Sequence, residues 1–256
     1  MSINDLHMFR AGSANDTTHQ HLWIKGAALH IPQLAALLKH VGHVPKIIDI
    51  SLFESGESAG LADLFCKHGS DKAATHNYYI LYAHILKSLG REKALNLLEI
   101  GMGTNNPTAV SSMGVDGRPG ASLHAWAEYL PTANIYGADI DRAILFDTDR
   151  IKTAYVDQLD ASTFTQLQER FNVKYDIVID DGLHAIGANL NTLLFALDNV
   201  RAGGWIIIED IWDKYIENWF AVDFILRSNP KYECALVKTR TSYMYVVHVR
   251  AFLSTL

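Results

Sequence analysis

The chain has 256 residues, 49% of them hydrophobic and 20% charged, which is the composition of a soluble globular protein long enough for one α/β domain and an N-terminal extension. The formal net charge is −6 and there is no long basic run, so we expect no binding to nucleic acid, whose phosphates require clustered Lys and Arg. No apolar run approaches the ~18–20 residues of a membrane span, and the N-terminus lacks a signal-peptide pattern, so no membrane partner is expected.

We interpret residues 1–60 as an N-terminal helical extension that packs on the main domain or on another subunit, and residues 61–256 as that domain. Residues 32–41 predict a short amphipathic helix in the extension. The small residues of 56–60 mark the boundary. Cys66 and Cys234 are far apart and show no metal-ligand spacing, so we expect reduced thiols in a cytoplasmic protein.

A polar motif, residues 67–72 (KHGSDK), precedes a helical stretch at residues 78–90. Asp71, Lys72 and His76 mix hydrogen-bond donors and acceptors next to two tyrosines. This composition suits the rim of a pocket, and we take the three residues as candidate substrate contacts. The same residues also fit the start of a helix with a packed aromatic face.

The central stretch is residues 96–103 (NLLEIGMG), an apolar run that ends in two glycines. Such a run suits a central parallel strand that is buried on both faces. Gly101 and Gly103 have no Cβ, so the backbone can turn tightly and approach a ligand. Glu99 lies two residues before the first glycine.

Residues 104–120 form a long polar loop with three glycines and two prolines, which we interpret as a lid or a substrate-contacting loop. Strands and helices then alternate. We expect strands at residues 135–140, 154–157, 175–179, 205–210, 232–237 and 243–249, and helices that begin near residue 122, span 162–171, end near 200 and span 214–227. With the central strand, this order predicts a doubly wound, mostly parallel, seven-stranded sheet with an antiparallel C-terminal hairpin.

Acidic residues follow several of these strands, and ligands of doubly wound sheets bind beyond the carboxyl ends of the strands. Asp139, at the end of the second strand, is placed to accept the two ribose hydroxyls of a nucleoside, although it would also fit as a helix cap. Asp157 follows the next strand and would lie near the base of the same nucleoside.

Two acidic pairs, Asp180-Asp181 and Glu209-Asp210, end strands that we expect to be neighbours, ~4.8 Å apart. Four carboxylates at that separation repel one another, and a divalent cation removes the conflict. Hard oxygen ligands favour Mg²⁺ or a similar ion, so we predict a metal at Asp181, Glu209 and Asp210. The alternative is that these acids cap the helices that follow.

His184 lies three residues after Asp181 and could face this metal without being a ligand. A hydroxyl bound to a dication loses its proton more easily, and a neutral imidazole can accept that proton near neutral pH. We therefore predict His184 as the catalytic base. A histidine at the start of a helix can also be purely structural.

The motifs together resemble the metal-dependent sugar O-methyltransferases of macrolide and aminocoumarin antibiotic biosynthesis. The resemblance covers roughly residues 65–215 and is carried by these motifs: HGSDK at 68–72 with His76, LEIG at 98–101, SL at 122–123 with Trp126, GADI at 137–140, IDDGLH at 179–184 and IED at 208–210. It implies a Rossmann-like class I fold that binds S-adenosylmethionine (SAM), a Mg²⁺ at Asp181, Glu209 and Asp210, and a base at His184.

The resemblance also implies a small-molecule acceptor with a hydroxyl group, such as a sugar, and a homo-oligomer. We expect the cofactor to contact Glu99, Gly101, Gly103, Ser122, Asp139, Asp157 and Asp180. Two features depart from the family: Leu183 stands where the family usually has Ser, and the 104–120 loop is longer.

Two other functions fit parts of the pattern. A nicotinamide-dependent oxidoreductase would need a third glycine where Asn106 stands, and an acid about 20 residues further on. A non-catalytic protein that binds SAM and metal on the same fold would bind the cofactor without turning it over.

Overall fold

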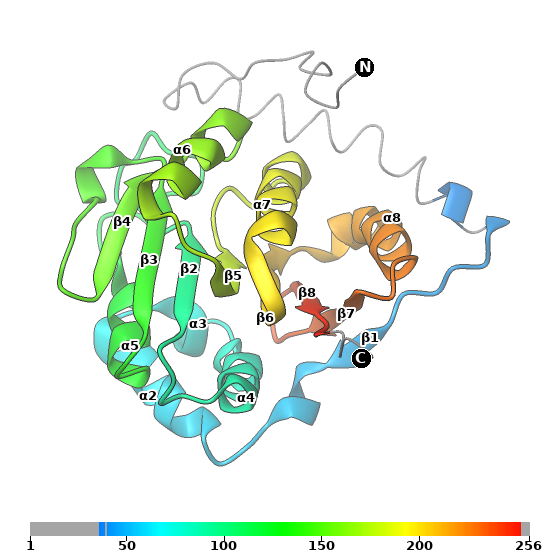
Figure 1. Cartoon of the computed structure of the whole chain (residues 1–256), viewed down its shortest axis with the longest axis horizontal. Coiled ribbons are helices and arrows are strands. Elements are labelled where there is room, and N and C mark those ends of the chain that lie inside the picture. Colours follow the sequence, from blue (N-terminus) through cyan, green and yellow to red (C-terminus); the bar gives the residue numbers. More distant parts are fainter. Residues whose placement is uncertain (1–35, 39, 252–256) are drawn as a thin grey trace, which may run out of the picture.

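The computed structural model describes residues 36–38 and 40–251 and contains one mixed sheet (Figure 1). Its strands are β1 (Ile47–Asp49), β2 (Asn96–Ile100), β3 (Asn134–Asp139), β4 (Ile151–Tyr155), β5 (Tyr175–Asp180), β6 (Val200–Ile211), β7 (Tyr232–Lys238) and β8 (Tyr243–Val249). The strand order is β1-β7-β8-β6-β5-β2-β3-β4, and only the pairs β6–β8 and β7–β8 are antiparallel. The predicted parallel sheet with an antiparallel C-terminal hairpin is confirmed.

The sheet has eight strands instead of the seven that we predicted, because β1 pairs in parallel with β7 at the edge. This strand has three residues and lies in the segment that we assigned to the N-terminal extension. The expected boundary near residue 60 falls inside helix α2 (Ser58–His68). Of the predicted helix at 32–41, the described residues 36–38 and 40 are helical, and the rest of the extension up to residue 35 lies outside the described residues.

Helices cover both faces of the sheet. On one face lie α2, α4 (Tyr79–Leu89) and α5 (Ala121–Tyr129), and the four-residue helix α3 (Asp71–Ala74) joins α2 to α4. On the other face lie α6 (Ala161–Phe171), α7 (Ile186–Asn199) and α8 (Ile216–Arg227). Short 3-10 helices, η2 (Ile50–Phe53), η3 (Arg142–Ile144) and η4 (Asp213–Tyr215), lie in the connections.

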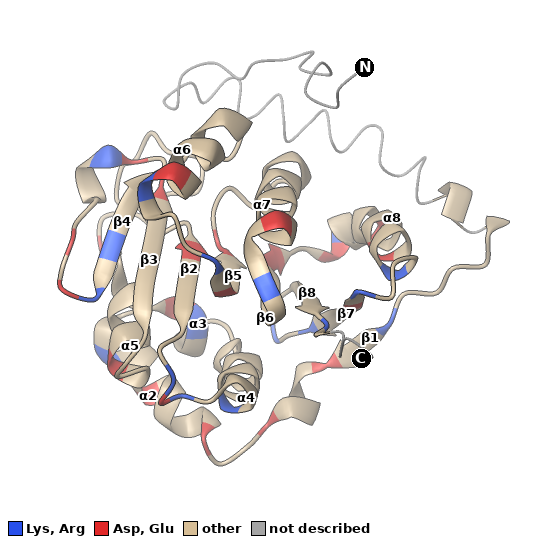
Figure 2. Ribbon diagram, viewed as in Figure 1, with Lys and Arg blue, Asp and Glu red and all other residues tan. Residues whose placement is uncertain are grey.

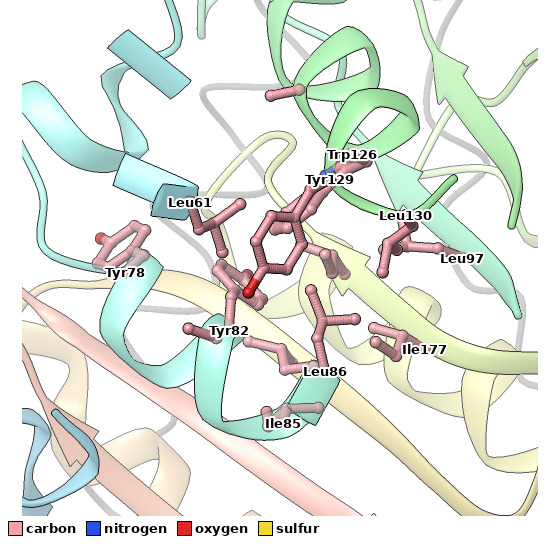
Figure 3. Packing of buried hydrophobic residues seen from close by; sticks show 14 of the residues in the cluster. Leu61, Tyr78, Tyr82, Ile85, Leu86, Leu97, Trp126, Tyr129, Leu130 and Ile177 are labelled. Carbon is pink, nitrogen blue, oxygen red and sulfur yellow. The ribbon is translucent and has the colours of Figure 1, made fainter. Parts of the chain in front are cut away.

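The alternation of side chains along the strands builds a core on each face of the sheet. In β2, Leu97 packs into the core under α2, α4 and α5, whereas Leu98 packs into the core under α6, α7 and α8. Figure 3 shows the first core, in which Tyr82 of α4 and Trp126 of α5 pack with Leu97. Both faces of β2 are therefore buried, as its continuous apolar run predicted.

The order in which successive strands are added to the sheet reverses at β2 and β5. From β2 the chain proceeds through β3 to β4, and it then returns to place β5 on the other side of β2. Ligands of such sheets bind at this switch point, beyond the carboxyl ends of the strands. Basic and acidic residues are interspersed over the elements (Figure 2), and no helix of the described residues is long and apolar enough to cross a membrane.

Candidate cofactor and metal site

The glycine turn after β2 packs tightly against the turn after β5. Gly101 has a φ of +92°, and a Cβ at this position would lie 2.0 Å from the backbone oxygen of Asp181. The Asp181 N–H donates to the Ile100 carbonyl at 2.7 Å, which holds the two turns together. Only glycine fits at residue 101, because a side chain would force these turns apart. Gly103 also has a positive φ, +74°, and faces Met113 of the 104–120 loop.

Asp139 lies at the end of β3 and is buried, and both of its oxygens accept backbone hydrogen bonds. The Met102 N–H donates to Oδ2 at 2.7 Å and the Asp141 N–H donates to Oδ1 at 2.9 Å. Burial raises the pKa of this carboxyl above its usual value, and the backbone donors partly offset that effect. Asp139 therefore anchors the glycine turn as well as facing the cavity beside it.

A cavity of about 50 Å³ lies at the switch point and contains four of the predicted cofactor residues. Its lining includes Gly101, Gly103, Asp139 and Asp157. Asp157 lies two residues beyond β4, its Oδ1 accepts the Leu159 N–H at 2.9 Å, and burial raises the pKa of its carboxyl. The glycine turn and the two acids thus meet at one cavity, as the sequence predicted.

Glu99 and Asp180 line neither this cavity nor the larger cleft beside it, contrary to their predicted contact with a cofactor. Glu99 is fully buried and accepts hydrogen bonds from Ser122 Oγ at 2.7 Å and from Trp126 Nε1 at 2.6 Å, because its strand position directs it toward α5. Asp180 is fully buried on the other face and accepts from Gln158 at 2.8 Å and Asn189 at 3.1 Å. Both acids hold the site's framework together.

Three side chains converge at the ends of β5 and β6: Asp181, His184 and Asp210. One ligand atom from each lies within 4.8 Å of the others. His184 Nε2 is 3.9 Å from Asp181 Oδ1 and 3.8 Å from Asp210 Oδ2. His184 and Asp210 both have a φ near +55°, a conformation that costs energy for these residues and is often found at functional sites.

Glu209 does not direct its carboxylate toward this group of three, although we predicted it as a metal ligand. Lys72 Nζ donates to its Oε2 at 2.5 Å, and the Tyr82 hydroxyl donates to its Oε1. The strand is irregular here: the β6–β8 register shifts between Ile208 and Ile211, and Asp210 has a φ of +54°. Glu209 therefore bonds Lys72 and Tyr82, while Asp210 keeps one oxygen, Oδ2, facing the cleft. Burial raises the pKa of the Glu209 carboxyl even with Lys72 beside it.

A cleft of about 700 Å³ opens above Asp181, His184 and Asp210, and it adjoins the smaller cavity. Gly103, Ser111 and Asp181 line both spaces, so a molecule in one can touch a molecule in the other. Residues of the 104–120 loop, including Met113 and Arg118, line the cleft. The loop has no helix or strand and its residues line both spaces, and its role in substrate contact stays a prediction.

Of the three candidate substrate residues, Asp71 and His76 line this cleft and Lys72 does not. His76 Nδ1 is 2.6 Å from Thr241 Oγ1, and its ring stacks on Tyr78. Lys72 is only 1% exposed, so a substrate in the cleft cannot reach it. Ser122, predicted for the cofactor, lines this larger cleft.

Sequence reasoning placed Tyr78 near a pocket without giving it a role, and it missed Tyr82. The Tyr78 hydroxyl donates to Asp210 Oδ1 at 2.6 Å, and Tyr82 bonds Glu209. Burial raises the pKa of both phenols, so both remain hydrogen-bond donors. Their spacing of four residues, which places both on one helix face, is a signal that could have identified them.

The glycine turn does not lead directly into a helix, because α5 begins only at Ala121. A dinucleotide-binding fold places its pyrophosphate at the N-terminus of a helix that starts within the glycine motif. This arrangement therefore disfavours the nicotinamide alternative.

No family model matches the chain. Among curated proteins, it is 34% identical over 157 residues to the 8-demethyl-8-(2-methoxy-alpha-L-rhamnosyl)-tetracenomycin-C 3'-O-methyltransferase of Streptomyces olivaceus, which covers 60% of this chain and 37% of that protein. It is 37% identical over 126 residues to the mycinamicin VI 2''-O-methyltransferase of Micromonospora griseorubida, which covers 49% of this chain and 29% of that protein. The chain spans 29–39% of the length of the curated relatives that it matches.

Among solved structures, the chain is similar to the MycE methyltransferase of the mycinamycin biosynthetic pathway in complex with Mg, SAH and mycinamycin VI. The TM-score is 0.60 at 24% identity, over 77% of this chain and 57% of that chain. The chain thus has the mixed α/β fold of the class I methyltransferases, and its resemblance to sugar O-methyltransferases of antibiotic pathways is confirmed.

Proposed function

We propose that this protein transfers a methyl group from SAM to a hydroxyl of a sugar or sugar-bearing small molecule, with the assistance of a divalent cation such as Mg²⁺. The observation that carries the proposal is the junction of two spaces at Asp181. One is the glycine-lined cavity with Asp139 and Asp157, and the other is the open cleft above Asp181, His184 and Asp210. A methyl donor and an acceptor hydroxyl can meet at this junction.

The residues present fit both groups. At Gly101 and Gly103 the backbone can approach a ligand closely, and Asp139 keeps lone pairs for ribose hydroxyls beyond its two backbone bonds. Asp181 Oδ1 and Asp210 Oδ2 are hard oxygen donors directed to one point, as Mg²⁺ requires. We propose these two as metal ligands, with Glu209 as the third, since its carboxylate keeps lone pairs beyond its bonds to Lys72 and Tyr82. The mycinamycin-pathway neighbour holds Mg and SAH.

A bound dication lowers the pKa of a hydroxyl that it contacts. We propose that His184 Nε2 accepts the proton of that hydroxyl, since this nitrogen faces Asp181 and Asp210 from 3.8–3.9 Å. With SAM bound at the glycine-lined cavity, the deprotonated hydroxyl would take the methyl group as the C–S bond breaks, and S-adenosylhomocysteine would be the leaving group. Asp71 and His76, on the wall of the cleft, would orient the acceptor.

The test separates a base from a metal ligand at residue 184. His184→Ala should lower turnover ~10²–10⁴-fold, while the affinities for SAM and for Mn²⁺ stay within about twofold of the wild type. Higher pH should partly restore the turnover. His84→Ala, at an exposed histidine on α4, is the matched control and should behave as the wild type. A large loss of Mn²⁺ affinity would instead make His184 a ligand.

Methyl transfer to sugar-bearing polyketides, measured with and without EDTA, tests the reaction itself. Full activity without divalent metal would eliminate the metal-assisted mechanism. Binding of SAM and Mn²⁺ without turnover of any acceptor would favour the non-catalytic partner protein. The proposal also includes a homo-oligomer, which the family resemblance supports, and a cytoplasmic location, which the two unpaired cysteines support.

A further inference from the structure

Lys72 is a fully buried cation at the centre of the acidic cluster. Lys72 lies in α3, and its backbone N–H donates to Oγ of Ser70, the N-cap residue of that helix. Its side chain is only 1% exposed. Its Nζ is 2.6 Å from Asp181 Oδ2, 2.5 Å from Glu209 Oε2 and 3.5 Å from Glu99 Oε1. The three acids come from three different strand ends. No contact with a substrate explains this arrangement, because the side chain lies beneath the cleft.

The surroundings keep Lys72 charged and in one position. Burying an ammonium group costs several kcal/mol unless it is paired and its hydrogens are bonded. An ammonium has three hydrogens, and here three carboxylates surround it. Asp181, Glu209 and Glu99 lie 2.5–3.5 Å from Nζ, and this pairing offsets the cost of burying the ammonium group. The side chain is therefore a fixed positive charge.

The contact divides the Asp181 carboxylate into two halves. Oδ2 bonds Lys72, and Oδ1 is left to face His184 and Asp210. Asp210 shows the same division, since its Oδ1 accepts from Tyr78 while Oδ2 faces the same point. Each acid thus has one oxygen anchored by a buried donor and the other directed into the cleft.

We propose that Lys72 is a positioning residue, which orients Asp181 for the divalent cation by holding the opposite oxygen of its carboxylate. This inference rests on the proposed function, since it requires that the protein bind a dication there. Lys72 contacts neither substrate nor reacting atoms. Outer partners of this kind typically contribute 10–100-fold to metal affinity.

The test is the Mn²⁺ affinity of Lys72→Met, measured by calorimetry together with the SAM affinity. We expect Mn²⁺ to bind 10–100-fold more weakly, with SAM affinity unchanged. The direction is diagnostic. Removal of a positive charge next to the site would, by Coulomb attraction alone, strengthen cation binding, so weaker binding reports lost orientation. The control is Lys67→Met, at an exposed lysine of α2 whose partner is Glu128.

Folding is checked by circular dichroism, and Lys72→Leu, which also removes the donor to Asp181, replaces Lys72→Met if the latter does not fold. Unchanged or tighter Mn²⁺ binding would overturn the inference, and so would an equal loss of Mn²⁺ and SAM affinity, which indicates general damage. If the wild type itself binds no Mn²⁺, the proposed function fails first. If the wild type binds Mn²⁺ and the variant binds it equally well, only the role of Lys72 is refuted.

Discussion

Asp139→Asn is the most informative single change at the proposed cofactor site. The substitution keeps the size of the side chain but replaces one acceptor oxygen by an NH₂ group. In the wild type both oxygens accept backbone bonds, from Met102 at 2.7 Å and Asp141 at 2.9 Å. One of these N–H groups would therefore face a donor in the variant. Asp139→Asn should weaken both the glycine turn and the binding of ribose.

The size of the effect follows from the bonds lost. A hydrogen bond to a charged group contributes ~1.5–3 kcal/mol. Loss of one backbone bond should lower the free energy of unfolding by about that amount, and loss of one ribose bond should weaken SAM binding about 10- to 150-fold. Urea denaturation measures the first quantity, and calorimetry with SAM measures the second.

Asp49→Asn is the matched control. Asp49 also accepts a backbone bond, from Ser51 at 2.9 Å, but it is exposed at the edge strand β1. The Asp49→Asn substitution should leave the affinity for SAM unchanged and should lower the free energy of unfolding only slightly. If folded Asp139→Asn binds SAM as tightly as the wild type, Asp139 is not the ribose acceptor and the cofactor has been misplaced.

Two further predictions concern backbone and thiol. Gly101→Ala should lower the free energy of unfolding by more than the ~1–2 kcal/mol that a left-handed backbone costs an alanine, because its Cβ would lie 2.0 Å from the backbone oxygen of Asp181. Gly203→Ala, where φ is +85° and the Cβ would meet no atom within 4 Å, should cost only ~1–2 kcal/mol. Equal losses of stability in urea denaturation would contradict the close approach at Gly101. Burial raises the pKa of the Cys234 thiol to about 11, whereas Cys66 is exposed. Ellman's reagent at pH 8 should therefore label one thiol in the native protein and two in urea. Rapid labelling of both thiols without urea would show that Cys234 is accessible.

Much of the site could be predicted because its residues follow directly after strands. Asp139, Asp181 and Asp210 were identified from their positions at strand ends, and parallel strands place such ends at one edge of the sheet. The glycine turn was evident from residues 96–103, since tight turns and close approach require residues without a Cβ. Local order along the chain was sufficient for each of these.

The role of individual acids within a pair could not be predicted in the same way. Asp180 turns toward Gln158 and Asn189, whereas Asp181 faces the cleft, and Glu209 turns toward Lys72 whereas Asp210 faces the cleft. Asp181 lies in the turn beyond β5 and Asp210 has a φ of +54°, so the directions of their side chains depend on local backbone geometry that the sequence does not state. Two neighbouring acids therefore looked equivalent.

The sequence by itself determined the order of strands and helices, the glycine turn and the edge of the sheet at which the acids gather, because periodicity and strand ends are local properties. Only the tertiary structure decided that β1 joins the sheet and that Lys72 lies under the cleft. Lys72 meets Asp181 and Glu209 across 109 and 137 residues of chain, and such a contact exists only after α3 has packed against the ends of β5 and β6. The partners of a buried charge are brought to it by the packing of distant elements, so local sequence periodicity does not predict them.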